Sequence, residues 1–205
     1  MVETRRQQIE NAASVLFRER GYAATSVRDI AQVLNLQGAS LYAHVASKED
    51  LLWSIVERAA DRFEAAVAPI AAAESPAPQR LRAMTGAHIR VVTGDLGNAV
   101  SFLDEWRFLS PERRTAVAAR RRRYERRFRE VIRDGVEAGD FARGTDPRLT
   151  ATWMLSALNG IAVWYRPDGE LDPESIADRY ADLFLSGLSG PPRPPAIDFD
   201  RRTDP

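Results

Sequence analysis

The segment from Thr25 to Asp50 constrains this chain more than any other, because it reads as two short helices separated by a sharp turn. Ser26 and Asp29 form a capping pair at the start of the first helix, where apolar residues recur at i, i+3, i+4 and i+7. Asn35 follows the last of them and is predicted to adopt the left-handed conformation that ends a helix. A second, shorter helix is predicted over residues 37–44. This pattern indicates a helix-turn-helix, whose second helix enters the major groove of DNA.

The geometry of such a unit assigns roles to its polar and small residues. Ser26 and Arg28 at the head of the first helix reach phosphates, and Arg28 can also reach a base edge. Gln37 carries an amide fork suited to adenine, and Gly38 permits a close approach of the backbone. The alternative is that two short helices with a tight turn form a plain packing unit. The predicted DNA-binding residues are Ser26, Arg28, Gln37, Gly38, Ala39, Ser40, Tyr42, His44 and Lys48.

A family resemblance rests on the same residues. The segment TSVRDIAQVLNLQGASLYAHVASKEDLL resembles the DNA-binding segment of the TetR family of bacterial repressors. In that family a threonine, a second hydroxyl residue and V-R-D-I-A are followed by A-L-Y-x-H-F and S-K-E-x-L at the same spacing. The resemblance implies that Tyr42, His44 and Lys48 contact the DNA backbone, although a surface imidazole is the alternative for His44. Gln37 and Ser40 differ from the residues that are common in the family at positions that face bases. They therefore affect which operator sequence is recognised and not whether DNA is bound.

Composition excludes several classes of protein. The 205 residues include no cysteine, which excludes disulfides, zinc fingers and thiol catalysis. No apolar run reaches the length of about 20 residues that a membrane span requires, and the N-terminus lacks the apolar core of a signal peptide. We therefore expect a soluble, cytoplasmic protein with no membrane partner. Because the net charge is +0, affinity for phosphate must come from a local face and from dimerisation.

The remaining sequence predicts an all-α fold. Helical periodicity continues to about residue 189, interrupted by proline and glycine, and no segment alternates as a strand. Asp146 and Asp172 each precede a proline and cap a predicted helix. We expect a helix-turn-helix domain over residues 1–46, a ligand-binding and dimerisation domain over 47–189 and a disordered tail over 190–205. The predicted helices, about nine in number, cover 4–20, 26–34, 37–44, 47–68, 78–93, 96–109, 112–138, 147–164 and 173–188.

Polar and aromatic residues within the apolar second domain are candidates for a ligand pocket. A few polar groups in an apolar cavity orient a ligand. For each of these residues the alternative is an ordinary place in the core, and we regard that as the more frequent role for a histidine such as His88. The predicted ligand-binding residues are His88, Phe102, Glu105, Trp106, Trp153, Asn159, Trp164 and Arg166.

A second, narrower resemblance concerns the segment NGIAVWYRPDGELDPESIADRYADLFLSGL. It is similar to the C-terminal part of TetR-type repressors that respond to acyl-coenzyme A thioesters, where W-[YF]-R-P-x-G-x-[LM] joins the last two helices. The resemblance implies an acyl-CoA effector and a dimer built from those two helices. Arg166 then contacts a CoA phosphate or a carboxylate of the partner subunit. The arginine-rich stretch 113–133 forms either a solvated helix face with i,i+4 pairs or an anion-binding rim.

These observations predict a homodimeric repressor that binds a palindromic operator and is released by a small hydrophobic effector. The alternative is a drug- or metabolite-responsive repressor of an efflux or catabolic operon with a non-CoA effector. An activator remains open. An enzyme is disfavoured, because the two histidines lie far apart in sequence and no nucleophile or phosphate-loop motif occurs. His88 with Asp104 or Glu105 leaves a metal site short of ligands, so we predict no catalytic residue, metal or cofactor.

Overall fold

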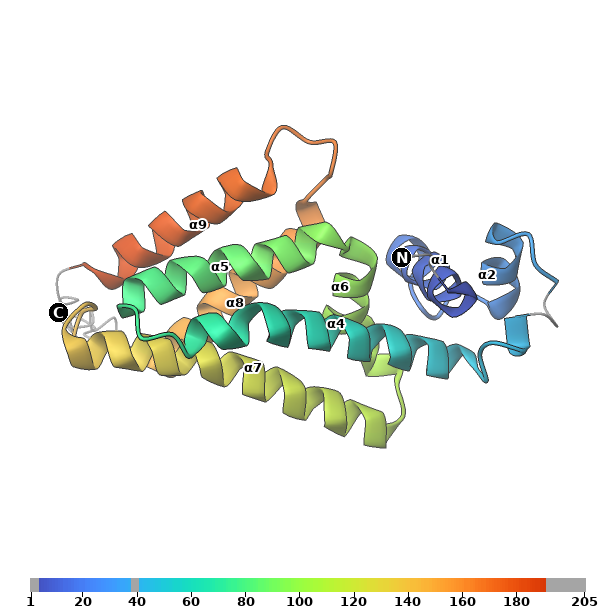
Figure 1. Cartoon of the computed structure of the whole chain (residues 1–205), viewed down its shortest axis with the longest axis horizontal. Helices are drawn as coiled ribbons and strands as arrows, with labels where there is room; N and C mark the ends of the chain where they lie inside the picture. The colour runs from blue at the N-terminus through green and yellow to red at the C-terminus, as the bar shows by residue number, and fades with distance from the viewer. Residues whose placement is uncertain (1–3, 38–40, 191–205) are drawn as a thin grey trace, which may run out of the picture.

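The computed structural model describes residues 4–37 and 41–190. Every regular element among them is a helix, which confirms the predicted all-α fold (Figure 1). Within this described part, no helix is long and apolar enough to cross a membrane. The predicted DNA contacts Gly38, Ala39 and Ser40 and the tail from residue 191 lie outside the described residues. The elements are α1 (Arg5–Arg20), α2 (Val27–Val33), α4 (Lys48–Ala71), α5 (Ala77–Gly94), α6 (Leu96–Leu103), η1 (Glu105–Phe108), α7 (Pro111–Ala138), α8 (Pro147–Trp164) and α9 (Pro173–Leu188).

The predicted capping residues begin the helices. At α2 the backbone N–H of Asp29 donates to Ser26 Oγ (3.2 Å), and the Ser26 N–H donates to Asp29 Oδ2 (2.7 Å). Asp172 accepts from the backbone N–H of Ser175 (2.8 Å) at the start of α9, and Asp146 caps α8 in the same way. These contacts satisfy N–H groups that have no partner within the helix. The bounds of α8 and α9 therefore fall where the sequence predicts them.

The turn after α2 has the geometry that the sequence predicts. Asn35 is left-handed, with φ of 53°. Its N–H donates to the carbonyl of Gln32 (3.1 Å), and the N–H of Leu36 donates to the carbonyl of Ala31 (2.8 Å). This pair of hydrogen bonds defines a Schellman ending, which reverses the chain after α2.

The predicted single helix over residues 96–109 is wrong. The α-helix ends at Leu103, and a separate 3₁₀ helix, η1, follows Asp104. The cause is a tertiary contact, because the guanidinium of Arg121 on α7 donates to the carbonyls of Phe102 (2.9 Å) and Leu103 (3.1 Å). These carbonyls therefore accept from a side chain at the point where the α-helix ends.

Helix α4 connects the two ends of the molecule. It contains 24 residues, which corresponds to a length of about 36 Å. Figure 1 shows its N-terminal end beside α1 and α2 and its C-terminal end beside α5 and α7. Leu52 and Ile55 near the first end and Phe63 and Val67 near the other are all buried in one continuous core. A displacement of α4 therefore changes the packing at both ends of the molecule.

A ladder of ion pairs joins α4 to α7. We define the α4–α7 ladder by the contacts of Arg113 with Glu49 and Asp50, Arg120 with Asp61, and Arg123 and Arg127 with Glu64. On α7 itself, the pair at i,i+4 spacing is that of Arg133 with Glu137. Four of the ten arginines in the stretch 113–133 therefore pair with acids of α4 instead of within α7, whereas others, such as Arg114 and Arg122, are exposed as a solvated face requires.

Candidate functional site

The candidate DNA-binding residues that the structure describes lie at the end of the molecule formed by α2 and residues 41–48 (Figure 1). The side chains of Ser26, Arg28, Gln37, Tyr42 and His44 are exposed. Leu41 and Val45 are buried, and the Val45 N–H donates to the Leu41 carbonyl (3.1 Å). The segment after residue 40 therefore packs its apolar residues inward and leaves polar ones available to a partner.

Lys48 differs from the others, because protein groups already surround it. Its ammonium donates to the carbonyls of Tyr22 and Thr25, both at 2.8 Å, and lies 4.1 Å from the centroid of the Tyr22 ring. Burial lowers the pKa of Lys48 from its ordinary value. Two of its three donors are thus engaged, and the residue ties the loop between α1 and α2 to the start of α4.

The same loop contacts η1. The backbone N–H of Tyr22 donates to Glu105 Oε2 (3.3 Å), and the Tyr22 ring stacks on Phe108 with centroids 5.4 Å apart. Close by, α6 approaches α1 so tightly that a Cβ added at Gly97 would lie 2.9 Å from backbone atoms of Ser14. These contacts form a junction between the N-terminal helices and the bundle. Glu105, predicted as a ligand contact, therefore faces the N-terminal helices.

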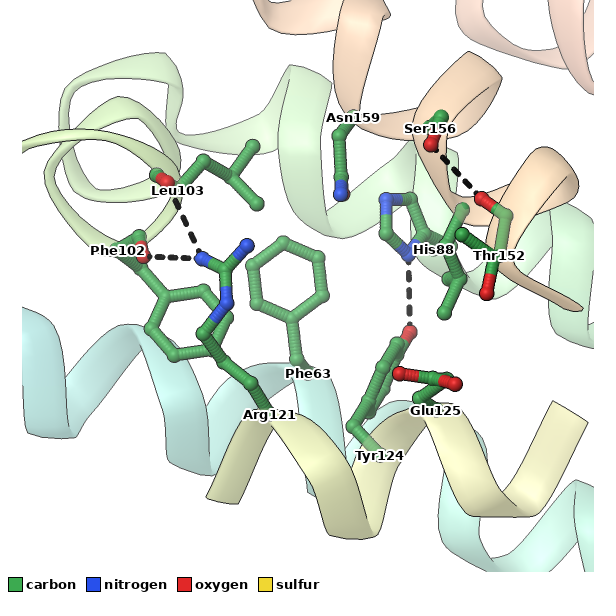
Figure 2. Close-up of a pocket in the computed structure, with 11 residues that line it drawn as sticks. Phe63, His88, Phe102, Leu103, Arg121, Tyr124, Glu125, Thr152, Ser156 and Asn159 are labelled. Carbon is green, nitrogen blue, oxygen red and sulfur yellow. Dashed lines mark hydrogen bonds between the residues drawn. The ribbon is translucent and has the colours of Figure 1, made fainter. Parts of the chain in front are cut away.

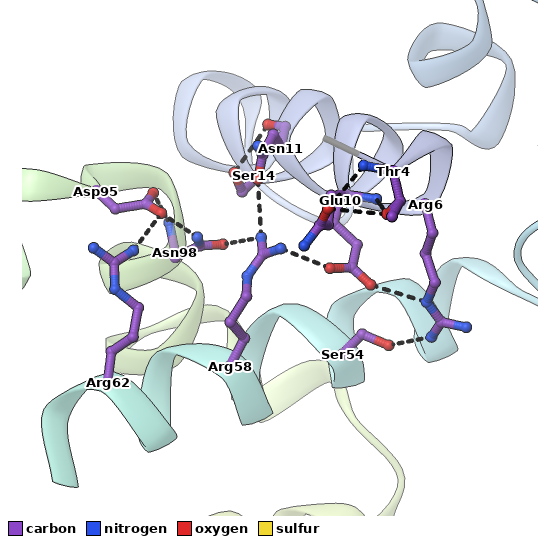
Figure 3. Close-up of polar contacts among 11 residues, drawn as sticks. Thr4, Arg6, Glu10, Asn11, Ser14, Ser54, Arg58, Arg62, Asp95 and Asn98 are labelled. Carbon is purple, nitrogen blue, oxygen red and sulfur yellow. Dashed lines mark hydrogen bonds and ion pairs between the residues drawn. The ribbon is translucent and has the colours of Figure 1, made fainter. Parts of the chain in front are cut away.

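A polar network extends this junction (Figure 3). The guanidinium of Arg58 on α4 donates to Glu10 (2.7 Å) and Asn11 (3.0 Å) on α1 and to Asn98 (3.2 Å) on α6. Arg6 also contacts Glu10 at 3.1 Å. Because Arg58 is only partly exposed and Glu10 is buried, water screens this ion pair less than a surface pair. Three helices are thereby held in one arrangement.

A cavity lies within the bundle between α4, α5, α6, α7 and α8 (Figure 2). Its volume is about 180 Å³. The walls combine aromatic and aliphatic side chains with a few polar groups, which is the usual make-up of a ligand site. Three predicted ligand-binding residues, His88, Phe102 and Asn159, meet here. The cavity is lined by Phe63, His88, Phe102, Leu103, Arg121, Tyr124, Glu125, Thr152, Leu155, Ser156 and Asn159.

His88 is the most deeply buried polar group in this cavity. It is 1% exposed, and its Nδ1 lies 3.0 Å from the hydroxyl of Tyr124. Its Nε2 has no hydrogen-bond partner among the described residues, and the side chain of Asn159 lies beside it (Figure 2). Burial lowers the pKa of His88 to about 3, although the polar side chain of Asn159 acts to raise it. At neutral pH the ring is uncharged, and it offers a polar atom to a ligand.

Arg121 is a cavity residue that the sequence prediction missed. Its guanidinium lies 5.4 Å from the ring centroids of Phe102 and Trp106. Burial lowers the pKa of Arg121 from its ordinary value, and the charge of Asp104 opposes this shift. The sequence gives no sharp signal for it, since Arg121 lies four residues after the buried Val117 and three before the buried Tyr124, whereas Arg120 lies three after and four before the same residues.

The other predicted ligand contacts lie elsewhere. Trp106 packs against Arg121 but does not line the cavity. Trp153 is 52% exposed and Trp164 is 42% exposed, both on α8, and Arg166 is exposed in the turn after it. Trp153 contacts Phe184 of α9 edge-on, with centroids 5.1 Å apart. Tryptophan on α8 therefore belongs to an apolar outer surface that also includes Leu149, Val163, Leu171 and Leu183.

Comparison with known families divides the chain into two matched regions. Residues 9–55 match the family described as bacterial regulatory proteins, tetR family. Residues 74–188 match the family described as tetracyclin repressor-like, C-terminal domain. The second match alone covers more than half of the chain.

Individual relatives agree with these matches. The HTH-type transcriptional repressor KstR2 of Mycobacterium tuberculosis is 28% identical over 189 residues, which cover 92% of this chain and 94% of KstR2. PfmR, a regulator from Thermus thermophilus, is 39% identical with a TM-score of 0.79, over 86% of this chain and 96% of PfmR. AibR in complex with isovaleryl coenzyme A and operator DNA is 30% identical with a TM-score of 0.78, over 91% and 98% of the two chains.

Proposed function

Because the chain belongs to the TetR family of bacterial regulatory proteins, we propose that it is a homodimeric repressor that binds a palindromic operator and releases it when an acyl-CoA thioester fills its cavity. At the coarser level it is a transcriptional repressor of the TetR type, and the relatives named above are regulators rather than enzymes. The observation that carries the proposal is the placement of an interior cavity beside the helices that form the junction with the candidate DNA-binding residues.

Binding to the operator uses both subunits. Two recognition helices must lie about 34 Å apart to meet successive major grooves, so each half-site is read by one subunit. Gln37, Gly38, Ala39 and Ser40 read bases, and Ser26, Arg28, Tyr42 and His44 contact the backbone. The third donor of Lys48 is left for a phosphate. A tilt of α4 changes the spacing of the two helices, so effector and operator oppose each other.

The apolar outer surface of α8 and α9 supports the homodimer. Val163 is 74% exposed, and Leu149 and Leu183 are each 68% exposed. Apolar side chains gathered on two adjacent helices of a monomer mark an interaction site. A second copy of the same two helices covers this surface through a two-fold interface. Trp153 and Trp164 then contribute to the interface rather than to the cavity.

The size of the cavity favours a short acyl group. A volume of about 180 Å³ lies below the range of about 300–1,000 Å³ that is usual for pockets that bury drug-sized ligands. The cavity therefore suits a short branched chain better than a fused ring system, and the CoA part extends outward. The AibR relative, which is solved with isovaleryl coenzyme A, supports this class of effector. Arg121 in the cavity wall is the arginine that a polar group of the effector would meet.

Fluorescence anisotropy on labelled DNA from immediately upstream of the gene tests this function. We expect tight binding whose logarithm falls linearly with the logarithm of salt concentration, by about 0.9 per phosphate contact. Arg28→Ala should weaken binding and lower that slope by about one, whereas Arg18→Ala, an exposed arginine on α1, should not.

Titration with thioesters then tests the effector. Isovaleryl-CoA should release the DNA, and free isovalerate should not. Release by an uncharged hydrophobic compound but by no thioester would move the assignment to a non-CoA effector. Equal affinity for scrambled DNA would contradict the DNA-binding assignment at this sequence.

A further inference from the structure

Arg121 forms no ion pair among the described residues, and the nearby charge of Asp104 acts on it without a direct contact. Five other arginines of α7 form ion pairs, whereas the contacts of Arg121 are with two backbone carbonyls and two aromatic rings. Both hydrogen bonds come from Nη1, so the rest of the guanidinium fork has no hydrogen-bond partner among the described residues. A half-buried guanidinium in a cavity wall is therefore available to an oxygen atom that enters the cavity.

The two carbonyls that Arg121 holds end α6. Their position matters because η1 begins two residues later with Glu105, whose carboxylate accepts from the Tyr22 N–H (3.3 Å). Phe108, at the end of η1, stacks on the Tyr22 ring. One short segment, residues 102–108, is therefore held by Arg121 at one end (Figure 2) and contacts the loop before α2 through Glu105 and Phe108.

We propose that Arg121 is the latch between effector and operator: a carbonyl oxygen of the bound effector accepts from the unengaged part of the guanidinium and draws it away from Phe102 and Leu103, and the freed segment loosens its hold on Tyr22. This inference rests on the proposed function, since it describes how an effector in the cavity changes the contacts of the loop before α2. The cavity ligand and the Glu105 contact are thereby linked through a specific exchange of hydrogen bonds.

The surrounding groups select an uncharged acceptor. Glu125 lines the same cavity and opposes the attraction of Arg121 for a free carboxylate, while His88 is neutral and Asn159 can donate. A thioester or ketone carbonyl accepts from Arg121 without bringing a second negative charge beside Glu125. The carbonyls of Phe102 and Leu103 then lose a charged donor, which is a stronger partner than a neutral one.

Hydrogen exchange measured by mass spectrometry tests the latch without any ligand. Arg121→Met removes the donor and keeps a long apolar side chain, and Glu105→Gln weakens the acceptor at Tyr22. We expect each variant to accelerate exchange at the Tyr22 amide about tenfold, because one charge-assisted hydrogen bond is lost or weakened. Arg143→Ala and Glu74→Ala, two exposed residues far from the junction, should leave the Tyr22 amide unchanged.

Exchange in α9 separates a latch from general destabilisation. In Arg121→Met, faster exchange at residues 102–108 and at Tyr22, with α9 unchanged, supports the proposal. Faster exchange at residues 102–108 alone overturns it. If hydrogen exchange in Arg121→Met is faster throughout the protein, the variant is generally destabilised. The test then uses Arg121→Lys, which keeps the charge and a donor. Equal acceleration of Tyr22 and α9 in Arg121→Lys also overturns the latch.

A second set of measurements uses isovaleryl-CoA as the probe. Binding to the wild type should accelerate exchange at residues 102–108 and Tyr22 together, by a similar factor to that of Arg121→Met. If calorimetry shows that the thioester binds while both segments stay unchanged, the latch is wrong and the proposed function stands. If the thioester neither binds nor releases DNA, the effector assignment fails, and the variants alone decide the latch.

Discussion

The buried imidazole of His88 makes the stability of the protein depend on pH. In the folded state its pKa is about 3, whereas an imidazole in an unfolded chain titrates near 6.5. As the pH falls, the unfolded state therefore binds the proton first. The stabilisation is fully present above about pH 6.5, declines between about 6.5 and 3, and is absent below that range.

The magnitude follows from the same two values. Between about pH 6.5 and 4.5, linkage predicts that the free energy of unfolding falls by about 2 kcal/mol through His88 alone. Urea denaturation followed by circular dichroism measures this loss, at one protein concentration because the stability of a dimer depends on it. His88→Asn keeps a hydrogen-bond partner for Tyr124 and removes the titration. This variant should lose about 2 kcal/mol less than the wild type over that interval.

His44 supplies the matched control, since the chain contains two histidines and His44 is exposed. His44→Asn should reproduce the pH dependence of the wild type. Carboxylates with lowered pKa values, such as Asp50, lose stability at lower pH in all three proteins and cancel in the comparison. If His88→Asn loses stability as steeply as the wild type, the neutral buried imidazole is not the cause, and the assignment of His88 is refuted.

Two further variants test the junction and the outer surface. Gly97→Ala should destabilise the protein by about 1–3 kcal/mol, because its Cβ meets the backbone of Ser14 and α6 must move from α1. Gly94→Ala at the end of α5, where a Cβ would meet only the end of the Arg62 side chain at 3.9 Å, should change stability by no more than about 0.5 kcal/mol in the same urea titration. Leu183→Glu should produce a monomer in sedimentation equilibrium by placing a charge in the α8 and α9 surface. Val15→Glu, also an exposed apolar position but on α1, should remain dimeric, and a dimeric Leu183→Glu protein would contradict the assigned interface.

Local chemistry made most of the fold predictable from the sequence. Capping residues and glycine or proline determine where α1, α8 and α9 begin and end, because those interactions lie within a few residues of each other. The break after Leu103 was missed because its cause, Arg121, lies 18 residues further along the chain. No local pattern reports a contact of that kind.

The cavity was predicted only in part for a related reason. His88, Phe102 and Asn159 are placed together by the packing of α5, α6 and α8. Trp153 and Trp164 were assigned to the cavity because α8 carries apolar residues on two faces, and periodicity does not say which face turns inward. Arg121 was hidden among other arginines, because Arg120 has helical spacing to the same buried residues of α7.

The α4–α7 ladder has a mechanical consequence. Its four arginines pair with acids spaced along α4 from Glu49 to Glu64. If one helix moved by a turn along the other, all of these ion pairs would break. The two helices therefore behave as a single lever arm. Arg121 and Tyr124 lie on α7, whereas Asn159 lies on α8 and also lines the cavity. Under the proposed function, an effector bound between these walls would move α4 and α7 together, and the candidate DNA-binding residues at the start of α4 would shift with them.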